Sequence, residues 1–186
     1  MKSIFFLLIV FFTAEIYCQN TDEFQIYNAA FYTIQNSLKT NSYIKEYGVS
    51  DTTKIYVSQF LTNNNSIDTF LDSIISLTHN SLTKVEKVDL RNKMLDSIYS
   101  FEKNTPLYVW NGIFLPNKNK DHFHSKLKLV FGKYSNGFLT ARLFINDNCK
   151  DDFIECFTYN SEAFIDYLFI FEDNKIKNFI EYPGTF

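Results

Sequence analysis

Glycine, proline, cysteine and tryptophan are scarce in this chain of 186 residues, which contains 5, 3, 3 and 1 of them. The few glycines leave no glycine-rich loop that could cradle a nucleotide phosphate, and the few glycines and prolines argue against long flexible linkers. The sequence also has no Gly-x-Ser-x-Gly elbow and no His-Glu-x-x-His metal motif. Motifs therefore indicate no catalytic residue, no cofactor site and no metal site.

An excess of charge of one sign is lacking as well. The formal net charge is −3, whereas a nucleic-acid-binding domain needs a basic face and an anionic membrane surface attracts clustered Lys and Arg. We therefore expect no nucleic-acid partner. What the chain does have is apolar material, since 46% of its residues are hydrophobic and 21 Phe and 12 Tyr are among them. That composition excludes an intrinsically disordered chain.

The longest apolar run is short and lies near the N-terminus. Residues 4–12 are all apolar, follow Lys2 and precede a more polar stretch. About 20 apolar residues are needed to span a bilayer, so the pattern indicates a secretory signal peptide instead. We expect residues 1–18 to be removed and residues 19–186 to form a single α+β domain without a transmembrane segment. The expected location is the periplasm or the extracellular medium.

Lipid attachment at Cys18 is the alternative outcome of this signal. A lipoprotein signal carries an aliphatic residue at −3 and a small residue at −1 relative to its cysteine, but Glu15 and Tyr17 stand there. Cleavage between Cys18 and Gln19 is therefore favoured over anchoring. The Gln-Asn start and the composition rich in Lys, Asn, Phe and Ile resemble those of exported flavobacterial proteins, which implies a bacterial envelope protein.

Three stretches in the N-terminal half have the apolar spacing of amphipathic helices. The first stripe has Thr21 as its expected N-cap, the second follows Ser66, and the third follows Asp89 and should end before Pro106. Their apolar residues are Phe24, Tyr27, Phe31, Ile34 and Leu38 in the first, Ile67, Phe70, Leu71, Ile74 and Ile75 in the second, and Leu90, Met94, Ile98 and Phe101 in the third.

The C-terminal half has the alternation and turn residues of strands. Leu127, Leu129 and Phe131 alternate with polar residues or glycine, which predicts a strand with one buried face, and Asn136-Gly137 predicts a hairpin turn after it. Further strands are expected at residues 54–59, 107–114, 138–145, 153–159, 163–171 and 176–182, with a turn at 172–175. The expected fold is α+β, with N-terminal helices packed on one face of a C-terminal antiparallel meander.

Cys149 and Cys156 are the two cysteines that remain after removal of the signal. An even number of cysteines in an oxidising compartment favours a disulfide. Their six-residue spacing is not that of a redox-active or zinc motif, so a structural bond across two neighbouring strands is expected, with unpaired thiols as the alternative.

Two groups of residues could in principle bind metal. His122 and His124 would share a face of a strand, but Asp121 would point away and His79 is distant in sequence, so solvated loop histidines are favoured. Asp147, Asn148, Asp151 and Asp152 could supply oxygen ligands to calcium, yet the ligand order and the glycine of a calcium loop are missing. Turn residues are the simpler interpretation.

Aromatic side chains offer one further candidate surface. Tyr108 and Trp110 would share a strand face, and Tyr159, Tyr167 and Tyr182 lie on other predicted strands. Such faces bind sugars and peptides, but Phe and Tyr are also the ordinary contents of a small core. The adjacent acids Glu172 and Asp173 fall in a predicted turn, where solvation is expected rather than catalysis.

Two functions remain open from the sequence. The first is a non-enzymatic exported domain that binds a protein or a small ligand through its sheet face or loops. The second is an envelope hydrolase with an unrecognised site, using His122, His124 or the acids near Cys149. A cleft where histidines and carboxylates converge would favour the enzyme.

The signal peptide makes a direct prediction about the mature protein. Mass spectrometry of protein isolated from its native host should find Gln19 at the N-terminus. Retention of Met1, or a lipid on Cys18, would contradict it.

Overall fold

The computed structural model describes residues 23–50, 52–62, 68–102, 108–110, 125–149, 156, 158 and 160–186. The signal peptide expected at residues 1–18 lies outside these residues. Helical elements are a first helix (residues 23–38), α2 (Ser42–Glu46), the 3-10 helix η1 (Asp68–Phe70), α3 (Leu71–Thr78) and α4 (Lys84–Glu102). The strands are β1 (Ile55–Thr62), β2 (Tyr108–Trp110), β3 (Leu127–Gly132), β4 (Phe138–Ile145), β5 (Ala163–Glu172) and β6 (Lys175–Thr185). None of the described helices is long and apolar enough to cross a membrane.

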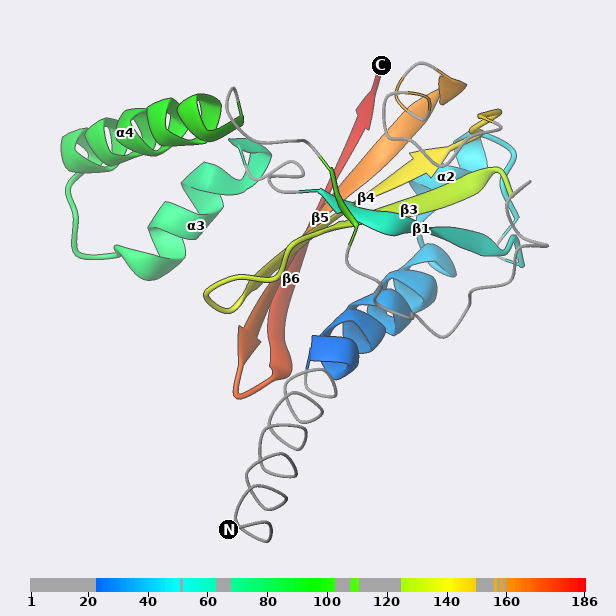
Figure 1. Cartoon of the computed structure of the whole chain (residues 1–186), viewed down its shortest axis with the longest axis horizontal. Helices are drawn as coiled ribbons and strands as arrows, with labels where there is room; N and C mark the ends of the chain where they lie inside the picture. The colour runs from blue at the N-terminus through cyan, green and yellow to red at the C-terminus, as the bar shows by residue number, and fades with distance from the viewer. Residues whose placement is uncertain are drawn as a thin grey trace, which may run out of the picture.

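These strands form one six-stranded sheet in the order β2-β1-β3-β4-β5-β6. The class α+β is confirmed, and strands β3 to β6 form the expected antiparallel meander. The purely antiparallel sheet was wrong, because β1 pairs with β3 in parallel. The chain leaves β1 through α3 and α4, returns as β2 on one side of β1, and adds β3 on its other side (Figure 1). A parallel pair requires such a long connection.

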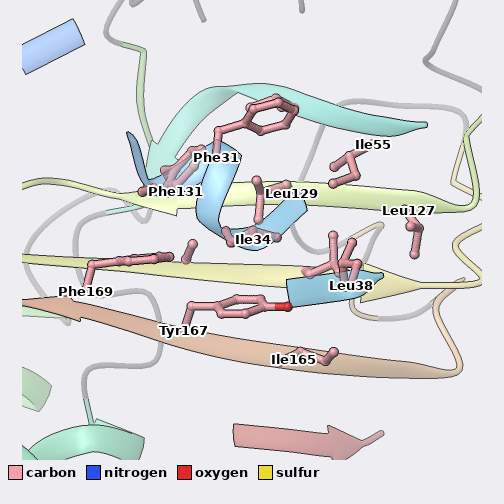
Figure 2. Close-up of a cluster of buried hydrophobic side chains, with 14 of the residues drawn as sticks. Phe31, Ile34, Leu38, Ile55, Leu127, Leu129, Phe131, Ile165, Tyr167 and Phe169 are labelled. Carbon is pink, nitrogen blue, oxygen red and sulfur yellow. The ribbon is translucent and has the colours of Figure 1, made fainter. Parts of the chain in front are cut away.

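The first helix lies against one face of the sheet, here called the first face. Its stripe is confirmed: Tyr27, Phe31, Ile34 and Leu38 are fully buried, and Phe24 at the start is partly exposed. These side chains pack on alternate residues of the strands, and Figure 2 shows Phe31, Ile34 and Leu38 together with Leu129, Phe131, Tyr167 and Phe169. Apolar residues three or four apart share one face of the helix, and apolar residues two apart share one face of each strand. The two faces meet and form one continuous core.

Helices cover the opposite, second face as well, so their expected restriction to one face was wrong. Phe70 of η1 and Ile74 of α3 pack on Leu168, which alternates with Tyr167 and Phe169 along β5. Strand β3 is buried on both faces as well, because Cys149 and Cys156 pack on Val130 of its second face, and even Lys128 is 1% exposed. The alternation of Lys126 and Lys128 with leucines had predicted a solvated face. It failed at Lys128 because that ammonium has a buried ionic partner.

Both predicted hairpin turns are confirmed. Asn136 and Gly137 have φ angles of 51° and 79° at the β3–β4 turn, and Asp173 and Asn174 have 51° and 58° at the β5–β6 turn. Positive φ at two successive residues is what a two-residue hairpin requires, and Asn, Asp and Gly tolerate it best. The two turns fix the register of the meander.

Two predicted element boundaries were wrong. Cys156, Thr158 and Asn160 are helical, so the described part of the strand expected at 153–159 is not extended.

Helix α4 begins at Lys84 rather than behind Asp89. Its start is set by a capping box, because Glu86 Oε2 accepts hydrogen bonds from Thr83 N and Thr83 Oγ1 at 2.8 and 2.7 Å. These bonds hold the pKa of Glu86 below its usual value.

Tyr27 attaches the first helix to the β3–β4 hairpin. Its hydroxyl donates to Gly132 O at 3.2 Å and accepts from Tyr134 N at 3.0 Å, and its ring meets Phe131 edge to face. Burial raises the pKa of Tyr27 well above its usual value, so the hydroxyl keeps its proton and can serve both partners.

We expect Tyr27→Phe to destabilise the protein by about 1–3 kcal/mol, because Gly132 O and Tyr134 N lose their shared partner. Tyr32→Phe on the same helix is the matched control, since Tyr32 is 53% exposed. Urea unfolding measures both variants. Equal stability of the two would mean that the Tyr27 hydroxyl does not attach the helix.

Candidate functional site

The candidate site lies where the end of the first helix meets the outer strand β6. A pocket of about 740 Å³ opens there, lined by Ser37, Thr40, Asn41, Ser42, Phe179, Ile180 and Glu181. We call it the Glu181 pocket. Four of its seven lining residues carry hydroxyl or amide side chains, and Glu181 supplies a carboxylate.

A tight turn between two helices builds the polar wall of the pocket. The first helix ends because the backbone N–H groups of Thr40 and Asn41 both donate back to Ser37 O at 3.1 Å. Asn41 then caps α2, since its Oδ1 accepts from Tyr43 N at 2.9 Å. The polar residues that end one helix and begin the next therefore face β6.

The register of β5 and β6 builds the opposite wall. Tyr167 and Glu181 are direct partners in this antiparallel pair, and so are Phe169 and Phe179. Directly opposite residues point to the same face of a sheet, and the rings of Phe169 and Phe179 indeed stack at 6.0 Å. The Glu181 side chain consequently lies beside the buried ring of Tyr167, on the first face.

The polar hydrogens of the pocket wall are largely in use. Ser37 Oγ donates to Ile34 O at 3.0 Å, and Thr40 Oγ1 donates to Ser37 O at 3.2 Å. Asn41 Nδ2 donates to Glu181 Oε2 at 3.3 Å. The hydroxyl hydrogens of Ser37 and Thr40 are therefore in use, and one of the two amide hydrogens of Asn41 is as well.

Glu181 Oε1 is buried next to this wall without a hydrogen-bond partner among the described residues. The Tyr167 hydroxyl is buried behind the wall, where the Ser37 side chain is its hydrogen-bond partner. Figure 2 shows the Tyr167 hydroxyl directed toward the ribbon of the first helix near Leu38. Burial raises the pKa of Tyr167 far above its usual value, and the negative charge of Glu181 raises it further, while the nearby Ser37 hydroxyl opposes the rise. Tyr167 is thus a neutral hydroxyl held beside a carboxylate.

Two buried charged groups on the second face are paired, in contrast. Arg142 and Asp166 face each other across β4 and β5 and form a bidentate ion pair at 2.7 and 2.8 Å. Asp166 is fully buried, and the Arg142 guanidinium also lies 4.4 Å from the centre of the Phe164 ring. This fork geometry satisfies both carboxylate oxygens.

A second buried ion pair joins Lys128 to Asp147, at 2.8 Å between Nζ and Oδ2. The main chain of Cys149 completes it, because Cys149 N donates to Asp147 Oδ1 at 3.0 Å and Cys149 O accepts from Lys128 Nζ at 2.5 Å. Asp147 therefore serves a lysine rather than calcium. Among the described residues, no group of three or more His, Cys, Asp or Glu could hold a metal ion.

The expected disulfide between Cys149 and Cys156 is present, with 5.6 Å between the Cα atoms. Its expected place across two facing strands was wrong, because Cys149 follows β4 and Cys156 is helical. Both sulfurs pack against Val130 and Phe144 on the second face. The bond thus holds the main chain that completes the Lys128–Asp147 pair.

The remaining sequence candidates do not gather into one site. His79 is exposed, and its Nδ1 lies 2.7 Å from Thr78 Oγ1. Glu172 and Asp173 lie at the β5–β6 turn as predicted, and Glu172 forms an ion pair with Lys177. Asn148 and Tyr182 are exposed, and Tyr167 belongs to the core. The structure does not describe the other sequence candidates: Asp121, His122, His124, Asp151, Asp152 and Tyr159, and the side chains of Tyr108 and Trp110.

Sequence reasoning missed Glu181. Glu181 stands two residues after Phe179 in the last predicted strand. Residues two apart share a face of a strand, so the sequence alone could have placed Glu181 on the same face as Phe179. Its partner Asn41 lies 140 residues earlier, and no local pattern links the two. Comparison with protein-family models, with curated proteins and with solved structures found no match for this chain.

The Lys128–Asp147 pair should matter far more to stability than an exposed pair. Asp147→Ala leaves a buried ammonium without its counter-ion, so we expect a loss of about 3–5 kcal/mol. Glu172→Ala removes the partner of the solvent-exposed Lys177 and should cost less than about 1 kcal/mol. Urea unfolding distinguishes the two. Similar small losses would mean that the buried pair is not needed for folding.

Proposed function

We propose that this protein is an exported, non-enzymatic binding domain that takes a small polar ligand in the Glu181 pocket. The observation that carries the proposal is Glu181 Oε1, a buried carboxylate oxygen without a hydrogen-bond partner among the described residues, in a pocket with a polar wall. An unpaired buried polar group costs free energy, and a bound ligand that supplies hydrogen bonds removes that cost.

The same pocket favours binding over hydrolysis. General acid–base catalysis needs a proton donor and a proton acceptor placed around one reacting bond. The described residues bring one carboxylate to the pocket and no imidazole. The strongly raised pKa of Tyr167 makes its hydroxyl a poor proton donor and leaves no phenolate to act as a base. A site of this composition is suited to holding a ligand.

Export is supported by two features of the chain. The pattern of residues 1–18 is that of a signal peptide, and the Cys149–Cys156 disulfide is the kind of bond that persists in oxidising compartments. A bacterial envelope protein working in the periplasm or outside the cell would meet small solutes directly.

A ligand screen by NMR tests the proposal. The ¹⁵N-labelled protein is titrated with neutral polyols, amino acids and primary amines at millimolar concentration. We expect at least one class to shift the amide signals of residues 37–42 and 179–181. Ser42→Trp, which places an indole at the pocket rim, should abolish those shifts.

Ser76→Trp is the control, because Ser76 is an exposed residue of α3 outside the pocket. Binding should survive in that variant. The proposal is wrong if no class perturbs the pocket residues, or if binding is unchanged in Ser42→Trp.

A further inference from the structure

We infer that the ligand of the Glu181 pocket is a small primary amine, whose ammonium group is bound by the Glu181 carboxylate. This inference rests on the proposed function and specifies its ligand. It follows from which hydrogen-bonding groups of the pocket are already in use and which are not.

The open positions of the pocket are acceptors. Ser37, Thr40 and Asn41 already donate to Ile34 O, Ser37 O and Glu181 Oε2. Glu181 Oε1 is a buried carboxylate oxygen with no donor among the described residues. A ligand that fits must therefore bring donors, and an ammonium brings three with no acceptor.

The charges around the pocket favour a cation over a neutral donor. No Lys or Arg of the described residues forms an ion pair with Glu181. Lys39 is the closest cation in sequence to the wall, but its Nζ bonds Asn36 Oδ1 at 2.9 Å and Lys39 is not a lining residue. The C-terminal end of the 16-residue first helix adds partial negative charge on the same side.

An apolar surface lies next to these acceptors. Phe179 is 37% exposed, lines the pocket and shares the first face with Glu181. An aromatic ring attracts a nearby ammonium through its face and packs against a short hydrocarbon chain. The pocket therefore suits an ammonium carried on a few methylene groups.

The test compares n-butylammonium with n-butanol, which has the same chain and no charge. Binding is followed by the amide shifts of residues 37–42 and 179–181. We expect n-butylammonium to bind at least tenfold more tightly than n-butanol, and its affinity to fall as salt is added. Glu181→Gln should weaken n-butylammonium about tenfold or more, because bonds to a charged group are the strong ones.

Two variants separate recognition from folding. Glu172→Gln changes an exposed acid at the β5–β6 turn and should leave binding unchanged. The urea unfolding midpoint of Glu181→Gln is measured beside its binding. A variant that stays folded and no longer binds n-butylammonium has lost recognition, whereas a variant with a much lower midpoint has lost structure.

The outcomes keep the two proposals apart. If n-butanol binds the pocket as tightly as n-butylammonium and Glu181→Gln has no effect, the amine inference is wrong and the binding domain stands. If neither probe nor any member of the wider panel shifts the pocket residues, both proposals are wrong.

Discussion

A sheet that is covered on both faces must satisfy every polar group that it buries, and this constraint organises the whole structure. Arg142 donates two hydrogen bonds to Asp166. Lys128 forms an ion pair with Asp147 and donates to Cys149 O. The Tyr27 hydroxyl donates to Gly132 O and accepts from Tyr134 N. Glu181 Oε1 is the exception in the pocket, because it is buried without a hydrogen-bond partner among the described residues. Other oxygens without partners, such as those of Thr62 and Asn146, do not line the Glu181 pocket.

The position of the pocket follows from the packing of the first helix. Its stripe fixes the helix on the first face, and Tyr27 ties it to the β3–β4 hairpin, so the C-terminal end of the helix is carried to β6. Strand β6 is at the edge of the sheet order and pairs with β5 alone among the described strands. Side chains there can be partly covered and still be reached by a solute, which is what a binding site needs. Charges and a proline along this edge, including Lys177 and Pro183, also discourage pairing with another strand.

Local features were predictable from the sequence, and pairings between distant residues were not. The first helix and the turns at Asn136-Gly137 and Asp173-Asn174 depend on a few neighbouring residues, and their patterns were sufficient. The Thr83–Glu86 capping box was equally local, so placing the start of α4 behind Asp89 was an avoidable error. The parallel β1–β3 pair, the burial of Lys128 and the approach of Asn41 to Glu181 depend on contacts across 21 to 140 residues of chain. A two-residue alternation does not specify which strand lies next to which.

A high-resolution crystal structure grown with a primary amine tests the central claim most directly. The account predicts an ammonium nitrogen within about 2.7–3.2 Å of Glu181 Oε1, with the hydrocarbon chain against Phe179. A structure in which the Tyr167 hydroxyl bonds the Glu181 carboxylate directly, and in which the pocket holds water alone at saturating amine, would contradict it.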